Sequence, residues 1–315
     1  MNCLVTGAAG FIGSHLCEKL LNSGFSVIGI DSFTDYYSRE LKKKNLSYLL
    51  EKQKFEFIKG DINHIDLNKH IEKSDTVFHL AAQAGVRASW GDYFATYTKN
   101  NIESTQKILE ASKKSKIKKI VYASSSSVYG NTPDLPMKET SRLFPYSPYG
   151  VTKLAAENLC SLYYENYGVP VVSLRFFTVY GPRQRPDMAF HKFFKAIGEN
   201  RPIEIYGSGE QTRDFTYIDD IVNATITAAE KGKPGKIYNL GSGNHQKLSI
   251  VFPLLEKICG KNVTIKNIET QKGDVKNTYA SISRARKDLD YNPRGTLQEG
   301  LQQEWLWIKK IYSFK

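Results

Sequence analysis

The chain has 315 residues, of which 41% are hydrophobic, and a formal net charge of +12. This length and apolar content predict a large core, formed by one large domain or by two lobes that share a cleft, and argue against a disordered chain. The lysines are scattered without interleaved aromatic residues, so the charge predicts solvated faces and some attraction for an anionic substrate. We expect no nucleic-acid partner.

Short, β-rich apolar runs alternate with helical patterns through the first half of the chain. This alternation predicts an α/β fold with a doubly wound parallel sheet of the Rossmann type. Helices such as residues 102–111 and 154–167 are expected to cover the two faces of the sheet. The expected strands are residues 4–5, 27–30, 55–58, 77–80, 120–122 and 171–174.

The pattern changes after Arg175, where prolines and repeated glycines break the chain into short elements. We predict a dinucleotide-binding domain in residues 1–174, to which residues 214–244 return. Residues 175–315 are predicted to form mainly a smaller α/β lobe that binds the substrate. Further helices are expected at residues 221–231, 248–258 and 297–311, and a further strand at 236–240.

The four cysteines are far apart in the sequence, and the six histidines are dispersed. No group of these residues has metal-ligand spacing, so we expect buried, reduced thiols and no metal site. Met1 leads into the apolar strand Cys3-Leu4-Val5 without the basic segment and long apolar segment of a signal peptide, and no apolar run reaches membrane-spanning length. The sequence therefore predicts a cytoplasmic protein with no membrane segment.

Three glycines, Gly7, Gly10 and Gly13, lie between the first strand and the helix that begins near Phe11 and Ile12. Glycines at this spacing allow a tight turn that brings backbone N–H groups to a pyrophosphate at the helix N-terminus. The second strand ends at Asp31, about twenty residues further on, where a carboxylate accepts bonds from ribose hydroxyls and repels a 2′-phosphate. We therefore predict NAD in preference to NADP.

Two further groups of cofactor residues are predicted where the next two strands end. The carboxyl edge of a parallel sheet is where nucleotides bind, so these residues are expected to contact the adenine and the middle of the cofactor. The third strand is followed by Asp61 and Ile62, and the fourth by Leu80, Ala81, Ala82 and Gln83.

Tyr149 and Lys153 are four residues apart in a helical pattern. Side chains at this spacing share a helix face, so the Lys153 charge is expected to lie near the Tyr149 hydroxyl and lower its pKa from about 10. A phenol with a lowered pKa can act as a general base near neutral pH. The pair predicts redox chemistry beside the dinucleotide.

The chain resembles the extended short-chain dehydrogenase/reductase family over nearly its whole length. The resemblance rests on the glycine turn, the serine run 124–130 after the fifth strand, and the Tyr149/Lys153 pair. Segments 79–87 (HLAAQAGVR), 147–153 (SPYGVTK) and 175–189 (RFFTVYGPRQRPDMA) are similar to those of nucleotide-sugar epimerases. The last segment is most similar to that of UDP-glucuronate 4-epimerases.

This resemblance implies that UDP-glucuronate is converted to UDP-galacturonate through a transient 4-keto sugar, with NAD retained throughout and the protein a homodimer. Tyr149 would remove the C4 hydroxyl proton while hydride passes to the nicotinamide, and Ser125 would hydrogen-bond the same oxygen. Lys153 would also contact the nicotinamide ribose. The resemblance places Ser126 and Ser127 in the sugar pocket, and Asn100 and Phe176 on the cofactor side.

The resemblance also assigns the substrate end of the site. Thr178 stands where glucose/galactose epimerases have asparagine, and the Arg185 guanidinium is suited to a bidentate pair with a C5 carboxylate. Contacts to the diphosphate and uridine are implied for Arg87, Gln211, Arg213 and Asp274. Gln271 and Lys272 stand where many relatives have Arg-Pro, and Ser281 replaces a frequent aspartate, which weakens the uridine-end assignment.

Three alternatives stay open at this point. A UDP-glucuronate decarboxylase would begin with the same oxidation at C4, since the resulting β-keto acid can lose carbon dioxide. An epimerase of neutral sugars such as UDP-glucose and UDP-galactose would share the catalytic residues. Product analysis separates these. A non-catalytic NAD sensor would need no poised phenol, and added UDP-sugar would not change the absorbance of its bound NAD.

Overall fold

A seven-stranded parallel sheet forms the centre of the computed structural model, which describes residues 1–314. Its strand order is β11-β6-β5-β4-β1-β2-β3. Strands β2 and β3 lie on one side of β1 and β4 to β6 on the other, so the order in which the chain adds strands reverses at the boundary between β1 and β4. The predicted Rossmann-type sheet is confirmed, because every expected strand is present and its ends lie within three residues of the expected ones. The strands are β1 (Asn2–Thr6), β2 (Ser26–Asp31), β3 (Phe55–Lys59), β4 (Thr76–His79), β5 (Lys119–Ser125), β6 (Val171–Phe176) and β11 (Ile237–Leu240).

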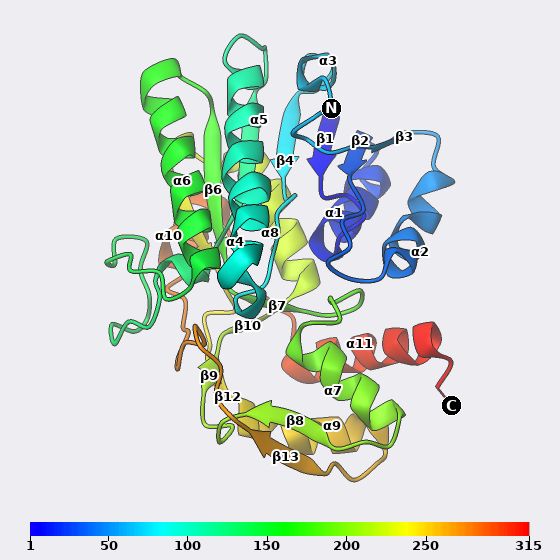
Figure 1. Cartoon of the computed structure of the whole chain (residues 1–315). Coiled ribbons are helices and arrows are strands. Elements are labelled where there is room, and N and C mark those ends of the chain that lie inside the picture. The colour runs from blue at the N-terminus through cyan, green and yellow to red at the C-terminus, as the bar shows by residue number, and fades with distance from the viewer. Residues whose placement is uncertain (315) are drawn as a thin grey trace.

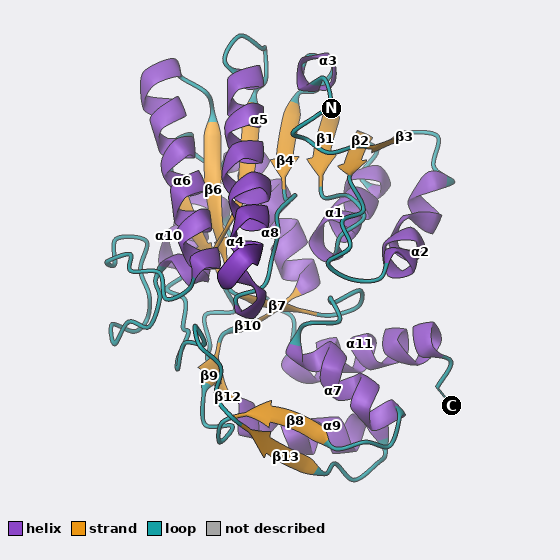
Figure 2. Ribbon diagram, in the orientation of Figure 1, coloured by secondary structure: helices purple, strands orange, loops and turns teal. Residues whose placement is uncertain are grey.

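Helices cover both faces of this sheet (Figures 1 and 2). Each face has its own apolar core. One core joins the sheet to α1 (Phe11–Asn22), α2 (Arg39–Leu50), α8 (Ile218–Lys231) and α10 (Ser283–Leu289). The other joins it to α3 (Leu67–Ile71), α5 (Ser104–Ser112) and α6 (Pro148–Tyr167). Helices therefore cover both faces, as predicted, and the two expected at 102–111 and 154–167 pack on the same face.

A run of irregular helix precedes α5. It comprises α4 (Phe94–Tyr97) and a π-helical segment, Thr98–Glu103. Such π-helical turns are rare and often occur at functional sites. This one carries Asn101, whose buried side-chain amide donates to the main-chain oxygen of Gln83 at 3.0 Å and to the Thr152 hydroxyl at 2.9 Å. The segment thereby ties the loop after β4 to α6.

The second lobe lies below the sheet in Figure 1 and has a core rich in aromatic side chains. Helix α7 (Ala189–Gly198) places Phe190, Phe193, Phe194 and Ile197 on one buried face. This helix was not predicted from the sequence, because Pro182 and Pro186 before it break the chain into short elements. The chain also forms α9 (Val251–Cys259), α11 (Leu297–Tyr312) and the strand pairs β7 (Thr178–Tyr180) with β10 (Phe215–Tyr217), β8 (Ile203–Tyr206) with β13 (Ile265–Ile268), and β9 (Thr212–Arg213) with β12 (Gln246–Lys247).

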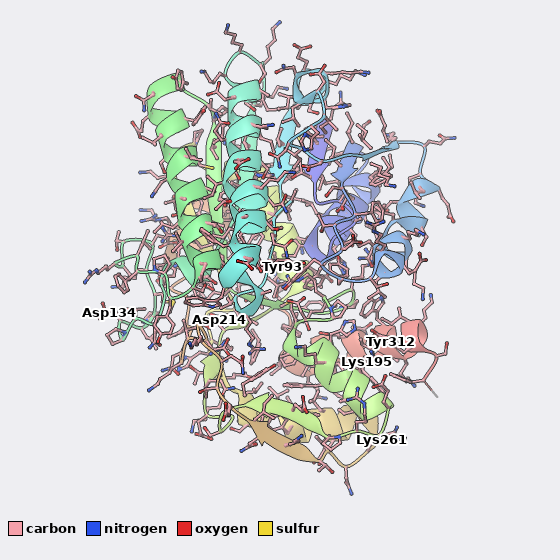
Figure 3. All side chains as sticks on the ribbon, in the orientation of Figure 1. Tyr93, Asp134, Lys195, Asp214, Lys261 and Tyr312 are labelled. Atoms are coloured by element: carbon pink, nitrogen blue, oxygen red, sulfur yellow. The ribbon has the colours of Figure 1, made fainter. Side chains whose placement is uncertain are left out.

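The chain crosses between the two lobes several times. Strand β11 pairs with β6 at the edge of the main sheet, with Asn239 opposite Arg175. Asp214, labelled in Figure 3, is buried where the two lobes meet. Its carboxylate accepts hydrogen bonds from Ser242 and from the main-chain nitrogen of Ala280. The division into domains at residue 174 stays a prediction. Within residues 1–314, no helix is long and apolar enough to cross a membrane.

Candidate active site

One cavity of about 790 Å³ lies between the two lobes, at the carboxyl edge of the parallel sheet. Every residue predicted for the cofactor, the chemistry or the substrate lines this cavity, although these residues are spread from position 7 to position 274. They are Gly7, Gly10, Phe11, Ile12, Gly13, Asp31, Asp61, Ile62, Leu80, Ala81, Ala82, Gln83, Arg87, Asn100, Ser125, Ser126, Ser127, Tyr149, Lys153, Phe176, Thr178, Arg185, Gln211, Arg213 and Asp274.

The glycine turn at one end of the cavity has no room for side chains. Gly7 has φ +75°, and a Cβ added to Gly13 would lie 2.0 Å from the Gly7 oxygen. Gly10 precedes α1, so free N–H groups of the first helical turn border the cavity and suit a pyrophosphate. The Asp31 carboxylate accepts from the main-chain nitrogens of Ala9 at 3.1 Å and Phe33 at 2.8 Å, which fixes it at the end of β2.

Gln83 offers an unused donor to this cavity. Its side chain is 3% exposed, and its Nε2 atom has no hydrogen-bond partner among residues 1–314. A buried amide without a partner is costly unless a ligand or water satisfies it. Together with the glycine turn and Asp31, this orphaned donor fits a dinucleotide that passes along the carboxyl edge of the sheet.

Tyr149 and Lys153 both lie on α6, as predicted. The prediction that Lys153 lowers the pKa of Tyr149 is wrong for the protein without bound ligands. Burial raises the pKa of Tyr149 above its usual value, and this outweighs the opposing effects of the Ser125 hydroxyl and the Arg185 charge. The Lys153 ammonium donates to the main-chain oxygen of Ala123 at 2.7 Å. Its own pKa is lowered to about 8, chiefly by burial.

A buried ion pair lies behind these side chains and was not predicted. Glu157, one helical turn beyond Lys153, receives two hydrogen bonds from Arg175, and both side chains are at most 2% exposed. The Ser124 hydroxyl donates to the same carboxylate at 2.7 Å. Because Ser124 precedes Ser125 and Arg175 precedes Phe176, the pair fixes α6 against the ends of β5 and β6.

The predicted uridine-end residues are brought together by folding. The Arg87 guanidinium bonds to Asp274 at 2.8 Å and stacks on the Tyr206 ring, 3.7 Å from its centroid. Gln211 donates to the main-chain oxygen of Tyr206 at 3.1 Å, and Arg213 donates to that of Lys276 at 3.0 Å. Tyr206 lines the cavity but was missed, because a single tyrosine in a short strand gives no signal in the sequence.

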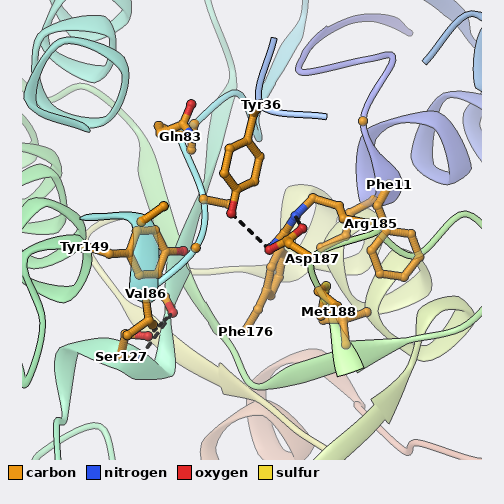
Figure 4. Close-up of a pocket in the computed structure, with 18 of the residues that line it drawn as sticks. Phe11, Tyr36, Gln83, Val86, Ser127, Tyr149, Phe176, Arg185, Asp187 and Met188 are labelled. Atoms are coloured by element: carbon orange, nitrogen blue, oxygen red, sulfur yellow. Dashed lines mark hydrogen bonds and ion pairs between the residues drawn. The ribbon is translucent and has the colours of Figure 1, made fainter. Parts of the chain in front are cut away.

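The part of the cavity predicted to hold the sugar lies between Tyr149, the serine turn and the loop 181–188 (Figure 4). Ser125 donates to Ser127 at 3.1 Å. Arg185 is already paired: its Nε and Nη2 atoms each lie 2.9 Å from an oxygen of Asp187. The Tyr36 hydroxyl donates to that carboxylate at 3.0 Å. Neither Tyr36 nor Asp187 was predicted, since their meeting depends on two loops 151 residues apart.

This cavity, with a dinucleotide turn at one end and a tyrosine–lysine helix at its centre, defines a nucleotide-dependent redox site. Residues 3–241 match the NAD dependent epimerase/dehydratase family. The chain belongs to this family.

Several similar proteins cover almost the whole chain. The UDP-glucuronate 4-epimerase of Thermodesulfobacterium geofontis is 42% identical over 313 residues, which are 98% of this chain and 96% of that protein. A Bacillus subtilis protein described as an uncharacterized UDP-glucose epimerase is 47% identical over 99% of each chain. The crystal structure of the UDP-glucuronic acid 4-epimerase of Bacillus cereus, in complex with UDP-glucuronic acid and NAD, superposes with a TM-score of 0.96. It is 47% identical and covers 99% of this chain and 100% of that chain.

Proposed function

We propose that this chain interconverts UDP-glucuronate and UDP-galacturonate by NAD-dependent epimerisation at C4. The observation that carries the proposal is the single cavity in which the glycine turn, the Ser125/Tyr149/Lys153 group and the Arg87/Asp274 pair all meet. The similarity to epimerases that act on UDP-glucuronic acid supports the same substrate. It is an isomerase reaction, because substrate and product have the same oxidation state.

The chain's own residues supply the proton chemistry. Tyr149 takes the proton of the C4 hydroxyl, and Ser125 orients that oxygen by hydrogen bonding. Since burial raises the pKa of the phenol, its base form depends on nearby positive charge, and the Arg185 charge lowers this pKa. The positive charge of an oxidised nicotinamide ring would act in the same direction when NAD is bound. Bound NAD supplies the acceptor and then the donor of the C4 hydride. The 4-keto sugar must turn over in the cleft so that hydride returns to its other face.

Closure of this cycle explains why the cofactor should stay bound. The orphaned Gln83 amide, the Asp31 carboxylate and the free N–H groups of α1 would hold it along the sheet edge. Release of reduced cofactor would leave a keto sugar that the protein could not reduce. We therefore propose that the protein purifies with NAD and turns over without added cofactor.

We propose that Arg185 binds the carboxylate of the sugar, and that Thr178, which also lines the cavity, assists it. The Nε–Nη2 edge of the guanidinium is bound to Asp187, so the substrate would use the Nη1–Nη2 edge that a planar guanidinium also offers. The second candidate is a neutral UDP-sugar epimerase. The 47% identity to the Bacillus subtilis protein favours keeping it in the test.

Product analysis tests the proposal. The purified protein is incubated separately with UDP-glucuronate and UDP-glucose, and the products are identified by NMR. The proposal expects UDP-galacturonate from the first and little conversion of the second. Formation of a UDP-pentose would indicate a decarboxylase, and efficient formation of UDP-galactose a neutral-sugar enzyme. Bound NAD with no conversion of either sugar would favour a sensor.

We also propose a homodimer that works in the cytoplasm. Two apolar side chains of α6, Val151 and Leu162, are 49% and 55% exposed, so they are accessible to a second copy of the chain. All four cysteines are free thiols, in keeping with a reducing compartment. Light scattering after gel filtration should give twice the chain mass, and Leu162→Lys should shift that mass toward the monomer.

A further inference from the structure

Asp187 and Tyr36 form a fixed group with Arg185 at the sugar end of the cavity (Figure 4). Both oxygens of the Asp187 carboxylate are used, one by the Nε atom of Arg185 and the other by its Nη2 atom and the Tyr36 hydroxyl. The Arg185 and Asp187 side chains keep 23% and 32% of their surface exposed. The pair is therefore part of the cavity wall and is not sealed in the core.

The Asp187 carboxylate is held ionised. Burial alone would raise its pKa, but the Arg185 charge and the hydrogen bonds from Arg185 and Tyr36 lower it overall. A second carboxylate that approaches Arg185 therefore meets a positive and a negative charge together. Its attraction to the guanidinium is reduced by repulsion from Asp187. This repulsion is stronger in the partly buried cavity wall than in bulk water, because the effective dielectric constant is lower there.

Tyr36 holds this arrangement from the opposite lobe. It lies in the segment 32–38 between β2 and α2, whereas Asp187 lies in the loop before α7. The Tyr36 hydroxyl is packed against Gly85, where an added Cβ would come within 2.1 Å of the phenol oxygen. This position restricts the ring, so Asp187 is kept beside Arg185 rather than turned toward solvent.

A closed epimerisation cycle places two opposing demands on the carboxylate site. The site must select the uronate, yet it must release the carboxylate while the 4-keto sugar turns over between the two hydride transfers. We propose that Asp187 is a positioning residue that weakens the hold of Arg185 on the substrate carboxylate so that the sugar can turn, and that Tyr36 keeps Asp187 in place. This inference rests on the proposed function, with Arg185 as the carboxylate contact.

Removal of the negative charge of Asp187 should increase the affinity for UDP-glucuronate and decrease kcat. Asp187→Asn keeps the side-chain shape and loses the charge, and Tyr36→Phe removes only the hydroxyl. Asp35→Asn is the matched control, because Asp35 lies on the same segment as Tyr36 and its partner is the exposed Arg39. Dissociation constants are measured by calorimetry on NAD-loaded protein in the Tyr149→Phe background, and kcat in the active enzyme.

With UDP-glucuronate, Asp187→Asn should bind about five- to tenfold more tightly and lose a similar factor in kcat, while its affinity for UDP-glucose stays within about twofold. Tyr36→Phe should shift both quantities in the same direction by less, and Asp35→Asn should match the wild type. Weaker or unchanged UDP-glucuronate binding in Asp187→Asn, or an unchanged kcat, would overturn the inference. If Asp187→Asn does not fold, the affinity for UDP-glucuronate and the kcat of Tyr36→Phe test the inference instead. Wild-type preference for UDP-glucose would instead refute the proposed function.

Discussion

The Lys153 ammonium donates a hydrogen bond to the main-chain oxygen of Ala123, 2.7 Å away on β5, so the charge of the lysine is held beside the sheet. Ala123 stands two residues before Ser125, and Lys153 stands four residues after Tyr149. The bond therefore sets the distance between the strand that carries the serine and the helix that carries the phenol. Burial lowers the pKa of Lys153 to about 8, so this link is charged at neutral pH and becomes uncharged in mild alkali.

Activity should therefore decline above about pH 8, as Lys153 loses its proton. Lys153→Arg should retain part of the activity, because a guanidinium keeps its charge in proteins, and its alkaline decline should move to higher pH. The measurement is the pH dependence of kcat for both proteins. An unchanged alkaline limb in Lys153→Arg would show that another group titrates there.

Tyr149→Phe should lose about 100-fold to 10,000-fold in kcat, because a positioned general base contributes that much to a rate. Substrate affinity should change little, since only the hydroxyl is removed. Turnover is followed by NMR, and binding by calorimetry. Retention of half the wild-type kcat would move the role of base to Ser125.

Acid should destabilise the fold partly through His15. Its pKa is lowered to about 3, first by burial and then by the Arg183 charge, against a value of about 6.5 in the unfolded chain. Between these values the unfolded chain binds the extra proton, so stability falls as pH falls through the window, by about 1.4 kcal/mol per pH unit. The His15 Nε2 atom lies 2.8 Å from the Pro182 oxygen, and His15→Gln keeps a donor there.

Between pH 7 and pH 4.5, urea unfolding should therefore show His15→Gln losing about 2 to 3 kcal/mol less stability than the wild type. Equal losses in the two proteins would mean that His15 is protonated in the folded chain.

Arg185→Ala should lower turnover of UDP-glucuronate and raise the share of decarboxylated UDP-pentose among the products. The ketone at C4 lies β to the carboxylate, so a guanidinium that stabilises the carboxylate charge opposes loss of carbon dioxide; a charged hydrogen bond of this kind contributes about 1.5 to 3 kcal/mol. Product ratios are measured by NMR. Unchanged epimerisation would transfer the carboxylate contact to another residue, with Arg87 the next to test.

The sequence was most informative where function depends on local pattern. The glycine turn, Asp31 at a strand end, and Tyr149 with Lys153 on one helix are short-range features, and all of them line the cavity. The contacts that determine charge in the site were not predictable in the same way. Arg175 with Glu157, and Tyr36 with Asp187, meet only after the strands and loops are placed. The raised pKa of Tyr149 likewise results from burial, which spacing along a helix does not reveal.

The fate of the C4 hydrogen is the most direct test of the closed cycle. UDP-glucuronate labelled with deuterium at C4 is incubated with the purified protein in ordinary water without added NAD, and the product is analysed by NMR. UDP-galacturonate is expected to retain deuterium at C4, because the same hydride is returned to the other face of the same sugar. Unlabelled UDP-galacturonate, with deuterium lost to solvent, would contradict it.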